Sequence, residues 1–530
     1  MNASGMLLNS AKSQLRAFLC VGLLTCHCLL SQEISKDGQS DSNQDWGSIE
    51  TLNAGDLQEA EREATIALHD PSSRPQALAT LGSIRFYQKR YAEAAQLLNS
   101  ALQIKPDLLS ARVSLGQLYA ATGREARARE AFEAVLGKDP RNYSAGFALA
   151  QLEFAHGDFN ASLIAAEPAL PDFKRTSEGI LLLARDYAAL GKTDLLLAIA
   201  GDWSNLAKLS AASSIEFAAI LVKSGLTQQA LDALIKAKDS GAVSYEMSMA
   251  LANLYSSNGD ADGAFSSYEA ARALNPGCVD CLLQLAMISR RRNDLEGSLA
   301  YLIKAKQKQP GNAGILFEFG KTCLELDLDD DAIPALEEAK RLQPGNQSYA
   351  YVLASAFVAK KRYEEAGNLF KSLLARHPSD PDLNYAMGSL LFLETKLDEA
   401  EIYLNKSVKL RPDQSVAYYC LGLIAAERHQ DDQAITILRD VVRRAPEYIA
   451  AYETLGKILV EDGKYPEAQQ VLEKALSLNP NSIAAHYQHG ILLSRIGKQD
   501  QAKEEFAIVR QLNMQEGGKS GVDLRILTPH

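Results

Sequence analysis

Blocks of basic residues are missing from this chain of 530 residues, and its overall charge is acidic. The sequence has 55 Lys and Arg residues against 66 Asp and Glu residues, which gives a formal net charge of −11 at pH 7. Nucleic acids and anionic membrane surfaces attract basic patches, so this composition argues against either as the main partner. No segment after residue 31 is apolar over enough residues to cross a bilayer, and we expect no transmembrane span in the mature chain.

Cysteine is also scarce, and no catalytic or metal-binding pattern stands out. Four of the seven Cys residues lie beyond the N-terminal segment, at Cys278, Cys281, Cys323 and Cys420. The C-x-x-C pattern of Cys278 and Cys281 favours a local disulfide or an inert pair over redox or metal chemistry at a helix start. A four-ligand zinc site needs a second pair, which the sequence lacks. With eight scattered His residues and no H-E-x-x-H, we expect no metal, no cofactor and no enzymatic activity.

The N-terminus carries the one long apolar run. Lys12 and Arg16 precede the uncharged residues 17–30, in the order of a secretory signal peptide. We therefore expect residues 1–31 to be a signal peptide and the protein to be secreted or periplasmic. A signal anchor is the alternative.

Two further features bear on this segment. Thr25 before Cys26 is a poor fit to a lipoprotein cleavage site, so we do not expect a lipid anchor at Cys26. Residues 32–45 are polar and read as a flexible linker.

The most frequent feature of the chain is a repeat of 34 residues. Gly recurs every 34 residues from Gly123 to Gly259, and Pro recurs at the same interval from Pro276 to Pro480. Both series share one register, in which fourteen frames run through residues 39–514 without insertion or deletion. A fixed period of this length is typical of a solenoid built from repeated supersecondary units.

Each frame predicts two amphipathic helices. One position of the second helix is Ala or Ser in nearly every frame, from Ala60 to Ala502, which indicates that two helices approach closely there. In the first helix, Gly or Ala follows a large apolar residue, as in Leu81-Gly82. Gly within a helix costs about 1 kcal/mol relative to Ala, so its recurrence implies a packing role. Gly between the helices permits a left-handed turn, and Pro ends the second helix.

This pattern resembles the tetratricopeptide repeat family. Its repeat positions are, in order, a large apolar residue, a small residue, Ala, an aromatic residue or Leu, and Pro. The resemblance covers almost the whole mature chain. It implies an all-α, right-handed superhelical solenoid of about fourteen antiparallel helix pairs, in which the first helix of each pair, helix A, lines a concave groove. Family members usually bind peptides, partner helices or subunits, and they are not enzymes unless fused to a catalytic domain.

The pattern degrades in the middle and at the C-terminal end. Residues 141–242 keep the register but lose the characteristic residues, and Pro168 and Pro171 lie inside a predicted second helix, which we expect to be short or bent. This stretch, with Trp203, is either a specialised partner surface or the result of drift in repeats that their neighbours support. Residues 515–530 have no helical pattern and form a predicted tail.

Aromatic residues recur at one position of helix A. This position lies away from the packing face, so we expect it to face the groove. Aromatic side chains there would be good anchors for a ligand, although the rings could instead pack between adjacent A helices. The candidate ligand-binding residues are Phe317, Tyr351, Tyr385, Tyr419 and Tyr487.

The sequence thus predicts a non-catalytic scaffold that binds a peptide or a partner protein in the concave groove. The alternative hypothesis is an accessory factor in envelope polysaccharide assembly or export, in which the same groove would engage glycan or synthase subunits.

Overall fold

The computed structural model describes residues 54–515. The predicted signal peptide, the linker and the possible lipidation site at Cys26 lie outside the described residues. The predicted tail also lies outside them, apart from Gln515, which is the last residue of a helix.

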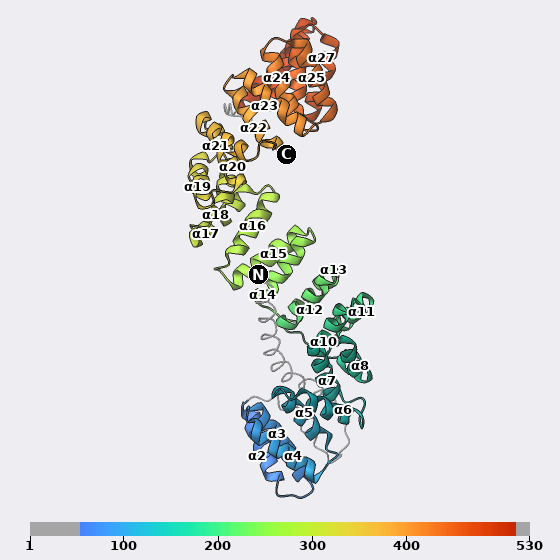
Figure 1. The fold of residues 1–530 in the computed structure, drawn as a ribbon. Coiled ribbons are helices and arrows are strands. Elements are labelled where there is room, and N and C mark those ends of the chain that lie inside the picture. The colour runs from blue at the N-terminus through green and yellow to red at the C-terminus, as the bar shows by residue number, and fades with distance from the viewer. Residues whose placement is uncertain (1–53, 516–530) are drawn as a thin grey trace. The chain divides into compact units, whose positions relative to one another are not determined.

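All regular elements in residues 54–515 are helices, and they fall into two compact units that meet in the sequence between Cys278 and Val279. Figure 1 shows the first unit in blue to green and the second in green to red. The first unit contains α2 (Ala54–Ala67), α3 (Arg74–Tyr87), α4 (Tyr91–Ile104), α5 (Leu109–Ala121), α6 (Glu125–Leu136), α7 (Tyr143–His156), α8 (Phe159–Ala166), η2 (Glu167–Ala169), α9 (Leu170–Phe173), α10 (Ser177–Ala189), α11 (Thr193–Ser204), α12 (Ala211–Lys223), α13 (Thr227–Asp239), α14 (Tyr245–Ser257) and α15 (Ala261–Leu274).

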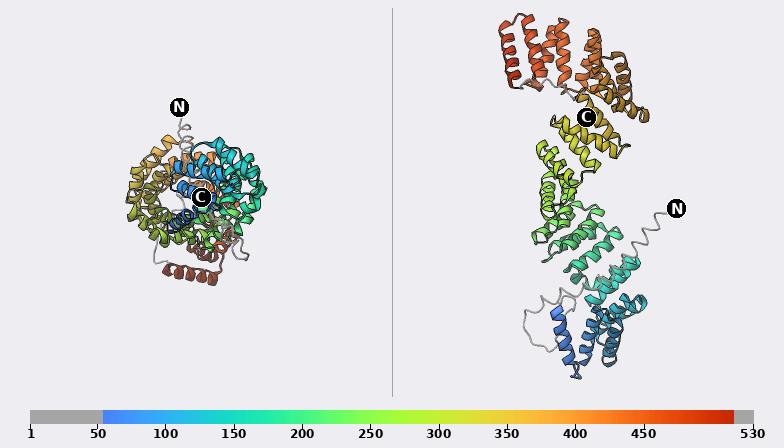
Figure 2. Two further views of the ribbon diagram at one scale, coloured as in Figure 1. Left: turned by 90° about the horizontal axis from the view of Figure 1, so that it is seen from below. Right: turned by 90° about the vertical axis from the view of Figure 1, so that its left-hand side faces the viewer.

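The second unit repeats the same alternation. It contains α16 (Val279–Arg291), α17 (Leu295–Lys308), α18 (Ala313–Glu325), α19 (Asp329–Leu342), α20 (Gln347–Ala359), α21 (Tyr363–Arg376), α22 (Pro381–Leu393), α23 (Leu397–Leu410), α24 (Ser415–Glu427), α25 (Asp431–Arg444), α26 (Ile449–Glu461), α27 (Tyr465–Leu478), α28 (Ile483–Arg495) and α29 (Gln499–Gln515). Within each unit a helix packs mainly on its two neighbours in the sequence, as α24 does on α25 and α23. Figure 2 shows these successive antiparallel pairs from two further directions.

The turns between helix A and helix B, the second helix of each pair, form where the sequence predicts them. Gly123 and Gly259 have φ values of 74° and 78°, in the left-handed region that glycine tolerates. Asn293, Asp327 and Lys361 adopt φ values of 58–61° at the same place in later repeats. Helix A therefore ends at this position in these repeats, even where Gly is absent.

Close helix contact explains the small residues. A Cβ atom built on Gly116 would lie 2.5 Å from Cε1 of Phe132, which is itself fully buried. On Gly388 it would lie 2.7 Å from Cγ of Leu404 and 3.2 Å from the carbonyl oxygen of Ala400. The recurrent Gly of helix A thus makes room for a large side chain of its own helix B.

The irregular repeats in residues 141–242 are bent but well packed. The predicted helix is divided into α8, η2 and α9, with Pro168 and Pro171 each in the first turn of a new segment, where a missing N–H is tolerated. This confirms the expected bend. Trp203 is fully buried and stacks on Phe217 with ring centroids 4.3 Å apart, so its ring belongs to the core and offers no partner surface.

None of the helices in the described part of the chain is both long and apolar enough to cross a membrane.

Candidate functional site

The predicted aromatic residues all occupy the fifth position of an A helix. They lie on α18, α20, α22, α24 and α28 of the second unit. Their environments differ, and the difference decides which of them a ligand could contact.

Phe317 and Tyr351 are partly buried. The Phe317 ring stacks on Tyr349 of the next A helix, with centroids 4.6 Å apart, and the Lys321 ammonium lies 5.9 Å from the Phe317 centroid. The Tyr351 ring meets Phe370 edge to face at 5.7 Å, and burial raises the pKa of the Tyr351 hydroxyl. Both rings keep some exposed surface on helix A.

Tyr385 and Tyr419 are part of the core. Tyr385 is completely buried, and burial raises the pKa of its hydroxyl. The Tyr419 hydroxyl lies 3.1 Å from Oγ1 of Thr454 on the following A helix, and its ring packs edge-on against Tyr448. For these two residues the structure fits the alternative in which the rings pack between adjacent A helices, because Tyr385 leaves no surface for a ligand.

Tyr487 differs from the other four because its side chain is 48% exposed. It lies on α28, the last A helix of the described chain, where no later A helix covers the ring. Its nearest aromatic neighbour is Phe506 on α29, with centroids 6.0 Å apart. Ligand binding by these residues stays a prediction, and Tyr487 offers the most accessible ring.

Sequence reasoning missed a second accessible apolar residue on an A helix. Met287 of α16 is 39% exposed and lies one helical turn beyond Leu283, the residue that occupies the aromatic position in that repeat. Residues four apart share a helix face. The signal was available in the sequence, but the absence of an aromatic residue at Leu283 hid it.

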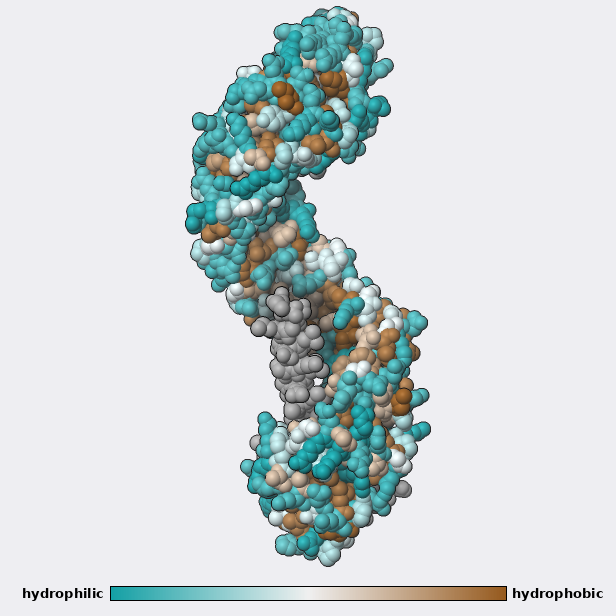
Figure 3. Space-filling view, in the orientation of Figure 1, coloured by the Kyte–Doolittle hydropathy of each residue, from teal (hydrophilic) through white to brown (hydrophobic). Residues whose placement is uncertain are grey.

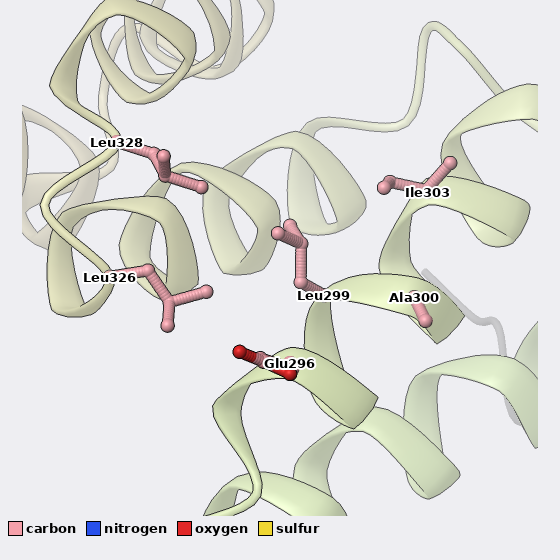
Figure 4. Close-up of a pocket in the computed structure, with 6 residues that line it drawn as sticks. All are labelled: Glu296, Leu299, Ala300, Ile303, Leu326 and Leu328. Atoms are coloured by element: carbon pink, nitrogen blue, oxygen red, sulfur yellow. The ribbon is translucent and has the colours of Figure 1, made fainter.

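A pocket on the helix B side was also missed. It has a volume of about 350 Å³ and lies between α17 and the turn that joins α18 to α19. Figure 4 shows the apolar side chains around it, with the carboxylate of Glu296 at the edge. The lining residues are Glu296, Leu299, Ala300, Ile303, Leu326 and Leu328.

Two of these lining residues give the signal that the sequence analysis overlooked. Leu326 and Leu328 lie on either side of the left-handed Asp327, whereas in the other described repeats at least one of these two turn positions is charged or polar. On the face visible in Figure 3, apolar residues occur as separate patches within a mainly hydrophilic surface. An apolar turn is thus a local departure from the repeat.

The remaining candidate sites from the sequence are the cysteine pair and any cluster of metal-binding side chains. Cys278 and Cys281 are buried and disulfide-bonded in the structure. The predicted local disulfide stays a prediction for the protein in its own compartment. Residues 54–515 contain no group of three or more His, Cys, Asp or Glu side chains arranged to hold a metal ion.

Comparison with protein families identifies the repeat. Models described as Tetratricopeptide repeat match residues 85–131, 113–174, 249–313, 324–381 and 357–426, and one described as TPR repeat matches residues 456–497. Together these matches span more than half of the sequence. The chain belongs to the tetratricopeptide repeat family, whose architecture is typically non-catalytic and supports a role as a protein–protein interaction scaffold.

Solved structures similar to this chain include other repeat proteins. A tetratricopeptide repeat protein from Parabacteroides merdae is 19% identical and covers 47% of this chain and 98% of its own, with a TM-score of 0.43. Yeast Tom70 is 16% identical and covers 85% and 98%, with a TM-score of 0.37. Cut9–Hcn1 of the APC/C is 13% identical and covers 87% and 98%, with a TM-score of 0.40. These scores are too low to support an argument about this chain. No curated protein matches the sequence.

Proposed function

We propose that this protein is a non-catalytic scaffold that binds a peptide or a partner protein along the face formed by its A helices. The observation that supports this proposal is the set of accessible apolar side chains on that face, namely Met287, Phe317 and Tyr487. A few residues carry most of the binding energy at protein interfaces, and aromatic side chains such as Tyr are enriched among them.

The test is affinity capture of partners from the native compartment. Met287→Ser and Tyr487→Ser each remove an exposed apolar side chain from an A helix, so both variants should fold normally. We expect them to lose most of the partner that the wild type captures. Ile402→Ser is the matched control, because Ile402 is 67% exposed on a B helix, α23. Equal capture by all four proteins would contradict the proposal, and capture of a glycan instead of a protein would favour the envelope polysaccharide alternative.

We further propose that the protein works outside the cytoplasm, in a secreted or periplasmic location. Support comes from Lys12, Arg16 and the apolar residues 17–30. Expression of the full chain followed by N-terminal sequencing of the mature protein tests this. Recovery of an uncleaved chain in the cytoplasm would contradict it.

A further inference from the structure

In three repeats of the second unit, an ion pair joins the start of helix B to the turn between helix A and helix B of the next repeat. In each case the acid is the second residue of helix B, and the cation lies beside the left-handed turn residue of the next repeat. The pairs are Lys360 with Asp330 at 3.2 Å, Arg428 with Asp398 at 2.5 Å and Lys464 with Asp432 at 3.4 Å.

The repeat of α17 keeps the acid but lacks the cation. Glu296 is the second residue of α17, as Asp330 is of α19. The equivalents of Lys360 and Lys464 are Leu326, which follows α18, and Leu328, which precedes α19. Among the described residues no Lys or Arg pairs with Glu296, so its carboxylate stands at the pocket edge without a cation.

The substitution of Leu for cations also opens an apolar surface. Ile303 and Leu328 are 41% and 40% exposed, and with Leu299 and Leu326 they line the pocket of about 350 Å³ shown in Figure 4. Further acids, Asp327 and Asp331, lie in the same turn and at the start of α19. The surface therefore combines an apolar pocket with the carboxylates of Glu296, Asp327 and Asp331, whereas Asp329 and Asp330 at the start of α19 pair with Lys360.

We propose that this pocket is a second docking site, separate from the A-helix face, for a partner segment that carries an aliphatic side chain next to Lys or Arg. The aliphatic side chain enters the cavity between α17 and the α18–α19 turn. The neighbouring cation pairs with Glu296 and supplies the charge that Lys360, Arg428 and Lys464 supply in the other repeats. Aliphatic burial provides the affinity, and charge complementarity selects the partner and makes binding sensitive to salt.

The experiment uses the full chain and three labelled synthetic peptides in a fluorescence anisotropy titration. The first carries Leu between Lys residues, the second has Glu in place of Lys, and the third has Ser in place of Leu. We expect the wild type to bind the first peptide, with weaker binding at higher salt, and to bind the other two at least about tenfold more weakly.

The decisive variant is Leu328→Lys, which places a cation where Lys464 lies in its own repeat. It should pair with Glu296, fill the pocket edge and weaken binding of the first peptide by at least about tenfold, while thermal unfolding stays unchanged or moves upward. Ile402→Lys adds the same charge at another exposed apolar residue of a B helix and should bind like the wild type. Glu296→Gln should bind the first peptide more weakly than the wild type and with a smaller salt dependence, because the peptide cation loses its carboxylate partner.

Several results would overturn the inference. The first is that the wild type does not bind the first peptide. The second is that the Leu328→Lys variant binds it as tightly as the wild type does. The third is that the Ile402→Lys variant loses as much affinity as the Leu328→Lys variant. Sedimentation velocity addresses another occupant: self-association of the wild type that Leu328→Lys abolishes would show a second copy of this chain at the site and would replace the proposed partner. None of these results alters capture through Met287 or Tyr487, so the two proposals fail independently.

Discussion

At the scale of single residues, burial sets the chemistry of the few polar groups within the core. Asp186 on α10 is completely buried and accepts a hydrogen bond from Oγ of Ser162 on α8 at 2.7 Å. Its second carboxylate oxygen has no partner in the described residues. Burial raises the pKa of Asp186 from 3.8 to about 7, against the lowering effect of the Ser162 hydrogen bond.

This raised pKa predicts a pH dependence of stability. The folded protein holds a proton on Asp186 that the unfolded chain releases near pH 4, so the favourable contribution is complete below pH 4 and is lost as pH rises towards about 7. Asp186→Asn removes the ionisation. We expect the free energy of unfolding of this variant, relative to wild type, to rise between pH 4.5 and pH 8 in guanidinium titrations followed by circular dichroism.

Asp239→Asn provides the control for this measurement, because Asp239 is exposed on α13. Its stability relative to wild type should stay nearly constant over the same pH range. An equally flat profile for Asp186→Asn would show that the buried carboxyl does not titrate as argued.

The buried thiols follow the same rule. Burial raises the pKa of Cys323 to about 11 and that of Cys420 to about 12. Because the thiolate is the reactive form, both thiols should resist maleimide at pH 8 in the folded protein. Both should label after addition of guanidinium. Labelling at Cys420 in the native protein, located by peptide mass spectrometry, would contradict its burial.

At the scale of helices, the ends are set by local hydrogen bonds that differ between repeats. Asp260 accepts hydrogen bonds from the backbone N–H groups of Asp262 and Gly263, at 3.1 and 2.9 Å, and so caps α15. Arg124 stands at the same place before α6 and makes no capping bond. The two helices form in the same frame, which indicates that packing on neighbours, more than capping, defines the repeat.

A pair of substitutions separates these two contributions. Asp260→Ala should lower the free energy of unfolding by about 1 kcal/mol, because two N–H groups of the first turn of α15 lose their acceptor. Arg124→Ala also places Ala at the N-cap position, but it removes no capping hydrogen bond. It should change the free energy of unfolding by less than about 0.5 kcal/mol. Equal losses in chemical unfolding would show that the Asp260 hydrogen bonds contribute nothing measurable.

At the scale of the whole molecule, each unit is held together by contacts between neighbouring helices. Within the second unit α22 packs on α21, α23 and α24, whereas α28 packs mainly on α26, α27 and α29. Such an arrangement makes stability approximately a sum of repeat and neighbour terms. Damage to one repeat should therefore remain local.

Gly388→Ala tests this locality. The added Cβ would meet Leu404 and the Ala400 carbonyl oxygen, and overpacking of this kind costs about 1–3 kcal/mol. We expect amide hydrogen exchange to accelerate in α22, α23 and α24 and to remain unchanged in α28. Gly367→Ala in α21 is the matched control, because its Cβ would lie 3.5 Å from Leu390, an ordinary contact. Faster exchange throughout the unit would contradict nearest-neighbour stability.

The candidate site was only partly predictable. The spacing correctly placed Phe317, Tyr385 and Tyr487 at the same position of their A helices, but it did not reveal how exposed each ring is. A ring at this position is covered by side chains of the following A helix, as Tyr349 covers Phe317 and Thr454 approaches Tyr419. Exposure therefore depends on a residue one repeat away, and a count along one helix does not include it.

The sequence by itself determined the repeat, the helix pairs and the positions of the turns. These follow from local causes, namely the steric limits of Gly and Pro and the period of the apolar residues, and they hold even in residues 141–242 where the pattern is weak.

Tertiary structure alone decided which side chains face solvent and where a ligand could fit. Tyr385 and Tyr487 occupy the same position of helix A, but Tyr385 is fully buried whereas Tyr487 is 48% exposed. Glu296 becomes a candidate binding residue only because Leu326 and Leu328 of the next repeat lie beside it. Both outcomes depend on contacts between residues about thirty positions apart, and only the packed structure brings such residues together.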